Sequence, residues 1–279
     1  MELNQLNFFY KEDISKMTLK EIRDYIKTRD KIKESFIKKL KIDSRKTTIE
    51  LALKCLKKND NLKKEKERIK NIKRTEKNLQ DKGYELIAGV DEAGKGALAG
   101  PVTAAAVIFP KNTEVLEITD SKKLSFKKRE SLYTKIVDEA LAIGVGMVSA
   151  QKIDSMGIST ANRLAMKKAC DQLDPEPDFV IIDSIKIDGL GFLHMSITRG
   201  DLNCYSIGAA SIIAKVTRDR LMIKLDKKYP EYDFKHNMGY GTKNHKEAVN
   251  THGYSEIHRK SFKFHQIQGE KLDFKCIND

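Results

Sequence analysis

Cysteine is scarce in this sequence, and its placement excludes two kinds of protein. Its four cysteines form no C-x-x-C pair and lie among apolar or helical residues: Cys55, Cys170, Cys204 and Cys276. This pattern argues against a disulfide framework and against a zinc site. It predicts reduced thiols in an intracellular protein.

Long hydrophobic runs are also missing. No apolar stretch approaches the roughly 20 residues that span a bilayer, and the first residues are acidic and polar, unlike a secretory leader. The sequence has neither internal repeats nor a Pro- or Ser-rich linker. Because 40% hydrophobic and 33% charged residues over 279 positions are ordinary values, we expect a cytoplasmic globular protein with no membrane segment. Its length suits one large domain with an extension, or two small domains.

Positive charge is in excess, and most of the excess lies near the N-terminus. Residues 1–83 hold 25 Lys or Arg against 14 Asp or Glu, whereas the rest of the chain holds 28 against 26. A basic segment attached to a nearly neutral body predicts a polyanionic partner, most simply nucleic acid. The alternative is a solvated surface without a partner. No aromatic residue interrupts residues 57–82, which favours contacts to phosphates without stacking on bases.

The change in charge also marks the predicted domain boundary. Thr18 and Glu21 have the spacing of a capping box, and helical spacing of apolar residues continues to about Leu79. Gly83 is placed to end the last helix. Residues 1–82 are therefore predicted to form a basic helical extension that contacts nucleic acid, and residues 83–279 to form the main domain.

The main domain alternates strand and helix patterns. Strands are predicted at 84–90, 102–109, 143–148, 179–183 and 192–198, and helices at 127–142, 158–173 and 203–228. We expect Ser159 to cap the second of these helices. The alternation predicts an α/β fold with helices on both faces of the sheet.

The segment 86–101, LIAGVDEAGKGALAGP, is the most informative for function. A short apolar run leads to Asp91 and Glu92, and a loop with glycines at 94, 96 and 100 follows. Adjacent side chains on a strand point to opposite faces, so the two acids can share one site only if the strand ends there. The glycines allow another backbone to approach closely. The segment therefore predicts a bound cation beside a phosphate.

Two more acids follow predicted strands, Asp183 directly and Asp201 after a short loop. Because ligands gather at the carboxyl ends of strands in such folds, four carboxylates are candidates for one site. Hard divalent cations take oxygen ligands, and two ions about 4 Å apart can clamp the attacking and leaving oxygens of a phosphodiester. The alternatives are that Asp183 merely ends a strand and that Asp201 caps the next helix.

Five sequence blocks resemble type 2 ribonucleases H, the ribonuclease HII family. They are GVDEAGKGALAGP at 89–101, TDSKKLS at 119–125, GD at 200–201 leading into AASIIAKVTRD at 209–219, NMGYGT at 237–242 and HRKSF at 258–262. The blocks run in the family's order, whereas the basic extension matches more loosely. The resemblance implies a ribonuclease-H-like mixed sheet with helices on both faces and a C-terminal helical part.

The resemblance also implies an activity. It is an endoribonuclease reaction on the RNA strand of RNA–DNA hybrids and on ribonucleotides embedded in duplex DNA. Water activated by Mn²⁺ or Mg²⁺ would attack the phosphodiester and leave 3′-hydroxyl and 5′-phosphate ends. We expect these duplexes to be the partners of a monomeric enzyme.

Residue by residue, the resemblance implies that the catalytic residues and metal ligands are Asp91, Glu92, Asp183 and Asp201, with Asp91 shared by both ions. It implies that Gly94, Lys95 and Gly96 recognise the ribose 2′-hydroxyl through their backbone. It also implies that Tyr240 stacks on the sugar beyond the ribonucleotide. Lys122 and Lys123 suit phosphate contacts.

Other cationic residues are weaker candidates. Lys95 stands where arginine is common in the family, which keeps the charge but loses the planar fork. One or more of Lys215, Arg218 and Arg220 are expected to face the groove. The six histidines are set aside because they are scattered and lack close ligand pairing: His194, His236, His245, His252, His258 and His265.

Two other classes of protein compete with the nuclease. One is a non-enzymatic nucleic-acid-binding protein in which the basic helices bind and the acids are turn residues. The other is a nucleotide-binding enzyme that uses the glycine loop as a phosphate cradle. The G-x-G-x-x-x-G spacing at 94–100 is neither the dinucleotide fingerprint nor a P-loop, which disfavours the second.

Overall fold

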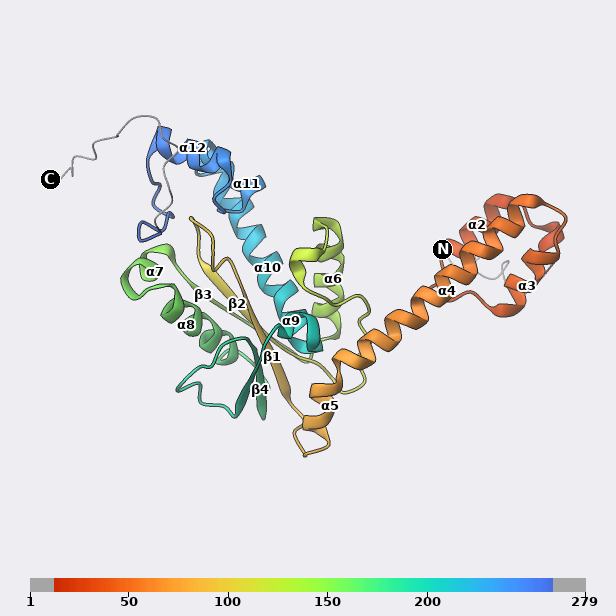
Figure 1. The fold of residues 1–279 in the computed structure, drawn as a ribbon, viewed down its shortest axis with the longest axis horizontal. Helices are drawn as coiled ribbons and strands as arrows, with labels where there is room; N and C mark the ends of the chain where they lie inside the picture. Colours follow the sequence, from red (N-terminus) through yellow and green to blue (C-terminus); the bar gives the residue numbers. More distant parts are fainter. Residues whose placement is uncertain (1–12, 263–279) are drawn as a thin grey trace. The chain divides into compact units, whose positions relative to one another are not determined.

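The computed structural model describes residues 13–262, and internal contacts divide the chain into two units, Met1–Lys70 and Asn71–Asp279 (Figure 1). Cys276, His265 and the polar first residues lie outside the described part. The other three cysteines are buried free thiols. Within residues 13–262, no helix is both long and apolar enough to cross a bilayer.

The N-terminal unit is helical, as predicted. It contains η1 (Ile14–Lys16), α2 (Leu19–Lys27), α3 (Glu34–Ile42) and the first part of α4 (Lys46–Ile72). The capping box is confirmed: the Thr18 N–H donates to Glu21 Oε2 over 2.7 Å, and the Glu21 N–H donates to Thr18 Oγ1 over 3.2 Å. Apolar residues from all these elements form its core, including Ile14, Ile22, Leu40 and Cys55.

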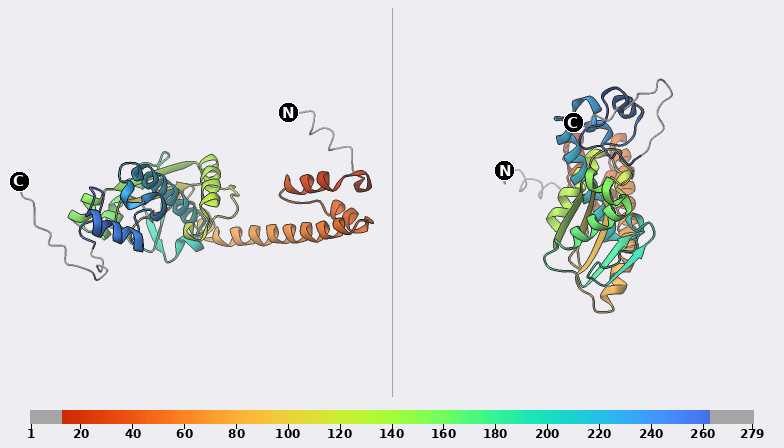
Figure 2. Two further views of the ribbon diagram at one scale, coloured as in Figure 1. Left: turned by 90° about the horizontal axis from the view of Figure 1, so that it is seen from above. Right: turned by 90° about the vertical axis from the view of Figure 1, so that its left-hand side faces the viewer.

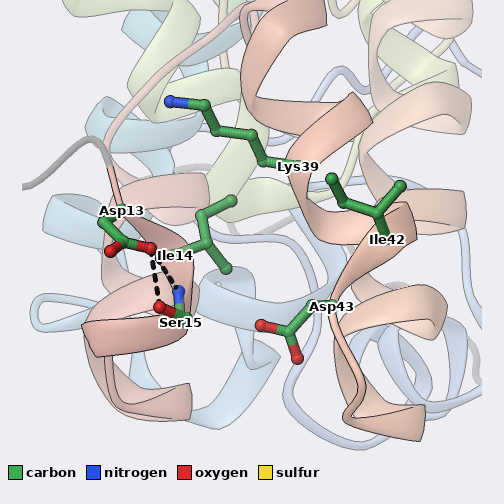
Figure 3. A pocket seen from close by; sticks show the side chains of 6 residues that line it. All are labelled: Asp13, Ile14, Ser15, Lys39, Ile42 and Asp43. Atoms are coloured by element: carbon green, nitrogen blue, oxygen red, sulfur yellow. Dashed lines mark hydrogen bonds between the residues drawn. The ribbon is translucent and has the colours of Figure 1, made fainter.

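Arg45 stabilises the start of this unit. Its guanidinium donates to the carbonyls of Met17 and Ile14 over 2.7 and 2.8 Å, and it also pairs with Asp43. A pocket nearby is lined by six residues, Asp13, Ile14, Ser15, Lys39, Ile42 and Asp43 (Figure 3). Both of its carboxylates already accept hydrogen bonds, Asp13 from Ser15 and Asp43 from Arg45. The two carboxylates of the pocket are therefore engaged in hydrogen bonds within the N-terminal unit itself.

The second unit is built on a five-stranded mixed sheet. Its strands are β1 (Ile87–Ala93), β2 (Val102–Ile108), β3 (Ala142–Val148), β4 (Phe179–Asp183) and β5 (His194–Ile197), in the order β3-β2-β1-β4-β5. β1 pairs antiparallel with β2 and parallel with β4. β3 joins antiparallel beyond β2, and β5 joins parallel beyond β4. This confirms the predicted mixed α/β fold.

Helices cover both faces of the sheet. Figure 1 shows α7 (Ala150–Met156) and α8 (Ile158–Cys170) on one side and α10 (Tyr205–Asp226) on the other, and Figure 2 shows these layers from two further directions. α6 (Phe126–Glu139) packs against α10. The N-cap of α8 is Gly157, so the prediction of a Ser159 cap is wrong.

Gly89 lets α10 lie directly on β1. A Cβ atom at this position would stand 2.2 Å from the carbonyl carbon of Ser206 and 2.3 Å from the nitrogen of Ile207, both in the backbone of α10. Only glycine can occupy this contact without displacing the helix.

α5 (Arg74–Gln80) lies within the second unit. Leu79 packs with Ile87 and Ile207. The buried Glu76 carboxylate accepts hydrogen bonds from the N–H and the hydroxyl of Ser206, over 2.8 and 2.9 Å, at the first turn of α10. A carboxylate is favourable at a helix N-terminus because unpaired N–H groups and the helix dipole converge there.

The C-terminal helical part is also present. It comprises η3 (Pro230–Tyr232), α11 (Phe234–Asn237) and α12 (Lys243–His252). Phe234, Tyr232 and Val249 pack there with Ala99 of the glycine loop and Met222 of α10. This packing brings the C-terminal part next to the glycine loop.

Candidate active site

The register of β1 and β4 brings Asp91 beside Asp183. The parallel pairing of the two strands runs from Ile87↔Phe179 to Val90↔Ile182, so both acids are the next residues after it stops. β1 itself continues to Ala93, paired with β2. The prediction that the strand ends at the acidic pair is therefore wrong.

Asp91 and Glu92 consequently point to opposite faces of β1. Asp91 shares its face with Gly89, which lies against α10, and there the Ser211 hydroxyl of α10 partly opposes the rise in the pKa of Asp91 that burial causes. Glu92 is on the face covered by α8, where the buried Asn162 only partly opposes the rise in the pKa of Glu92. The two carboxylates are nevertheless close enough for the charge of Glu92 to raise the pKa of Asp91.

Asp183 connects β4 to the segment that carries Asp201. Its Oδ1 accepts hydrogen bonds from the Gly200 N–H over 2.7 Å and from the Ser184 hydroxyl over 2.9 Å. Ser184 and Arg199 both have left-handed backbones, with φ of 57° and 55°, which allow the chain to turn here. Asp201 then lies in the first turn of α9 (Gly200–Asn203).

Burial and mutual repulsion disfavour charge on these acids. Burial raises the pKa of Asp91 well above its ordinary value, and the charges of Glu92 and Asp183 add to this. Burial also raises the pKa of Glu92, with Lys95 opposing. The pKa of Asp201 is raised by burial and then by Asp120 and Asp183. The structure therefore brings all four predicted carboxylates into one electrostatic cluster.

Lys122 is close enough to Asp91, Glu92 and Asp201 for their charges to change its pKa. Its side chain is exposed, and partial loss of hydration alone would lower its pKa, but Asp120, Asp91, Asp201 and Glu92 together outweigh this effect and raise the pKa. Lys122 belongs to η2 (Ser121–Lys123), which is connected to α10 by the Ser121–Ser211 hydroxyl pair at 3.0 Å. Lys123 is exposed on the same turn.

The donor set fits a hard divalent cation. It consists of carboxylate oxygens, which Mg²⁺ and Mn²⁺ accept, and its members repel one another unless positive charge is supplied. Across the described part of the chain, no three His, Cys, Asp or Glu side chains converge tightly enough to hold an ion as they stand. Binding therefore requires the carboxylates to turn toward one another.

The glycine loop is held by two buried arginines. Arg259 donates to the carbonyls of Gly94, Lys95 and Gly100 over 2.7 to 3.0 Å. Arg218 donates over 2.8 to 2.9 Å to the carbonyls of Ala99, Pro101 and Met238. Arg218 is fully buried, so of the three cations of α10 expected near the groove, only Lys215 and Arg220 remain candidates.

The loop's open side is at Gly96. A Cβ atom at Gly94, where φ is +84°, would stand 1.9 Å from Arg218 Nε, whereas one at Gly96 would meet nothing within 4 Å. Tyr240 lies nearby, with its ring centroid 5.4 Å from the Arg218 guanidinium and 5.3 Å from Lys215 Nζ. Lys95 Nζ is 3.7 Å from Glu92 Oε1, which connects the loop to the carboxylates.

Comparison with known proteins gives close relatives. The chain is 46% identical over 246 residues to ribonuclease HII of Clostridioides difficile, covering 88% of this chain and 96% of that protein. It is 50% identical over 210 residues to ribonuclease HII of Listeria monocytogenes, covering 75% and 79%. The crystal structure of ribonuclease H2 from Pyrococcus horikoshii OT3 is similar with a TM-score of 0.55 and 28% identity, covering 63% of this chain and 93% of that chain.

The strand order and the carboxylates at the end of the β1–β4 pairing define a protein of the ribonuclease-H-like class. Residues 88–265 match the family described as Ribonuclease HII, and residues 18–80 match the Ribonuclease HII N-terminal domain. The chain belongs to the ribonuclease HII family and is a ribonuclease.

Proposed function

We propose that this ribonuclease cleaves the RNA strand of RNA–DNA hybrids and cuts duplex DNA at embedded ribonucleotides. The products are 3′-hydroxyl and 5′-phosphate ends. The observation that carries the proposal is the cluster of four carboxylates at the end of the β1–β4 pairing, three of which have raised pKa values. Such a cluster is costly for the fold, and it is useful where cations and a phosphodiester must bind together.

In this proposal Asp91, Glu92, Asp183 and Asp201 hold divalent cations, Mn²⁺ or Mg²⁺, with Asp91 shared. When bound at these carboxylates, such cations would supply an activated water and positive charge to offset the phosphate. The Asp183 hydrogen bonds to Gly200 and Ser184 fix the segment that carries Asp201. Lys122 balances the carboxylate charge and, with Lys123, contacts the backbone phosphates.

The loop Gly94–Lys95–Gly96 is proposed to read the ribose 2′-hydroxyl. In a trans peptide the C=O and the following N–H point in opposite directions. Since the Gly94 and Lys95 carbonyls accept from buried Arg259, the N–H groups of Lys95 and Gly96 are directed away from it. The absence of a Cβ at Gly96 leaves room for the sugar. Tyr240 is proposed to stack on the next sugar.

The test uses three end-labelled duplexes: RNA on DNA, DNA with one ribonucleotide, and RNA on RNA. Each is incubated with Mg²⁺ and with Mn²⁺. We expect cleavage of the first two only, on the 5′ side of the single ribonucleotide. Binding without cleavage of any duplex in either metal would instead support the non-enzymatic nucleic-acid-binding protein.

Residues 1–82 are proposed to bind backbone phosphates, in a monomeric cytoplasmic enzyme. Replacing Lys57, Lys63 and Lys70 by glutamine should weaken duplex binding and flatten its salt dependence. The slope of log K against log salt should change by about 0.9 for each phosphate that is no longer neutralised. All three side chains are exposed. These substitutions leave α5 in place, whereas deletion of residues 1–82 would also remove Glu76 from the start of α10.

The control is a second triple variant with the same charge change in the other unit, at the exposed Lys111, Lys135 and Lys186. Binding is measured by fluorescence anisotropy over a range of salt concentrations. Equal slopes for the two triple variants would contradict the role proposed for the extension.

A further inference from the structure

Two histidines that the proposed mechanism does not use are buried side by side. His245 of α12 and His258 are 0% and 2% exposed. Their Nε2 atoms are 3.0 Å apart. The rings of Tyr232 and Phe234 pack against both histidines, and Tyr254 packs against His258. Two imidazoles in this environment need a defined proton arrangement.

The hydrogen bonds fix that arrangement. The Ser255 N–H can only donate, and it reaches His258 Nδ1 over 2.9 Å, so this atom accepts and the proton of the neutral ring is on Nε2. His258 Nε2–H then donates to His245 Nε2, which places the second proton on His245 Nδ1. That group donates over 2.8 Å to the Tyr240 carbonyl, which can only accept.

An added proton would put two donors face to face along this series of hydrogen bonds, either at the Ser255 N–H or between the rings, and the Ser255 hydroxyl, 2.7 Å from His258 Nδ1, would have to change from donor to acceptor. The pKa values agree with this arrangement. Burial, and then the neighbouring His245, lower the pKa of His258 to about 4. Burial also lowers the pKa of His245, against the opposing bond to Tyr240. The pair is therefore neutral and directional at physiological pH.

The pair connects the two proposed substrate-reading elements. The segment of His258 runs beside the glycine loop, with Ala99↔His258 as a β-bridge. The Gly100 N–H donates to the Ile257 carbonyl and the Arg259 N–H to the Leu98 carbonyl, each over 2.8 Å. Arg259 then holds the Gly94 and Lys95 carbonyls. At its other end the pair holds the backbone of Tyr240.

We propose that His245 is a positioning residue, with its tautomer fixed by His258: its hydrogen bond to the Tyr240 carbonyl fixes the Tyr240 backbone beside the Gly94–Gly96 loop and thereby sets the preference for a single ribonucleotide in DNA. This inference rests on the proposed function, because the roles of Tyr240 and the loop belong to it. Neither histidine touches substrate. The physical reason is that a displacement of about 1 Å in a positioning group can cost on the order of a hundredfold in rate.

Two substitutions of the same histidine separate positioning from packing. In His245→Asn the amide nitrogen takes the place of Nδ1 and can still donate to the Tyr240 carbonyl. In His245→Gln the amide takes the place of Nε2, so the contact with His258 remains and the donor to Tyr240 is removed. Both variants remove similar buried ring surface, so their thermal stabilities should fall by similar amounts.

The readout is kcat/KM on duplex DNA with one ribonucleotide divided by kcat/KM on the uniform RNA–DNA hybrid. We expect His245→Gln to lower this ratio about tenfold, within the hundredfold limit for misplacement, and His245→Asn to stay near wild type. The exposed His252→Gln serves as a control. Equal ratios for the Asn and Gln variants would overturn the proposal.

A mutant cycle gives the second test. If His245 acts through Tyr240, then His245→Gln should not change the ratio further in a Tyr240→Ala background, because residues that act as one unit are not additive. A further tenfold fall in that background would overturn the positioning role alone. If the wild-type protein cleaves neither duplex, the proposed function itself is refuted, and the selectivity role with it.

Discussion

Replacing Asp91 with asparagine should lower the rate of RNA–DNA hybrid cleavage by about a thousandfold or more. Asp91 is central to the carboxylate cluster, since Glu92 and Asp183 both act on it. Losing several kcal/mol of charge stabilisation at a metal site corresponds to about this factor. Single-turnover rates in Mg²⁺ and in Mn²⁺ measure the effect, with Asp188→Asn as the control because Asp188 is an exposed acid in the β4–β5 loop.

The same substitution should have the opposite effect on stability when divalent ions are chelated. Because the folded state raises the pKa of Asp91, the charged form costs folding energy at neutral pH, and this cost shrinks as the pH falls. Asparagine removes the charge, so Asp91→Asn should unfold at a higher temperature than wild type in chelator.

Adding Mn²⁺ or Mg²⁺ should then raise the melting temperature of wild type more than that of Asp91→Asn, since an ion that binds only the folded state stabilises it by mass action. Calorimetry with and without the ions measures both shifts. Asp91→Asn with cleavage within tenfold of wild type, or equal metal shifts in both proteins, would contradict Asp91 as a ligand.

Gly89→Ala should destabilise the contact between β1 and α10 strongly. The new Cβ would stand 2.2 Å and 2.3 Å from backbone atoms of Ser206 and Ile207. Backbone atoms cannot rotate away as a side chain can, so α10 must move off β1. We expect a loss of roughly 3 kcal/mol in the free energy of unfolding, at the upper end for overpacking.

Urea unfolding measures the loss, and Gly96→Ala is the matched control for stability because its Cβ would meet nothing within 4 Å. Displacement of α10 would also move Ser211, whose hydroxyl partly opposes the raised pKa of Asp91. Cleavage by Gly89→Ala should therefore fall even at temperatures where the protein is folded. Equal stability of the two alanine variants would refute the close contact between β1 and α10.

Much of the fold could be predicted because periodicity reports which residues are buried. The strands before and after the glycine loop and the long helix after Asp201 appear close to their predicted positions. The boundaries were less predictable. β1 continues through Asp91 and Glu92 because β2 supplies pairing partners as far as Thr103, and no local signal reveals such a partner. Similarly, α8 is preceded by Gly157 as N-cap although Ser159 is the better capping residue by type.

The candidate site was predictable where the chemistry resides in a residue type. The acids Asp91, Glu92, Asp183 and Asp201 stand out as carboxylates next to strand patterns, and the structure brings them together. Arg259 and the two buried histidines were missed. An arginine that holds main-chain carbonyls looks in sequence like any surface arginine, and two histidines 13 positions apart give no sign of contact.

The sequence by itself determined the family, the donor chemistry of the site and the basic character of the extension. These depend on which atoms are present and in what order. Only the tertiary structure decided that Asp91 and Glu92 face opposite sides of β1, that Lys122 lies within the electrostatic reach of three of the carboxylates, and that Arg218 is buried. It alone brought His245 onto His258. Such facts depend on through-space contacts between distant segments, and burial turns those contacts into large energies because buried charges and donors have no water to satisfy them.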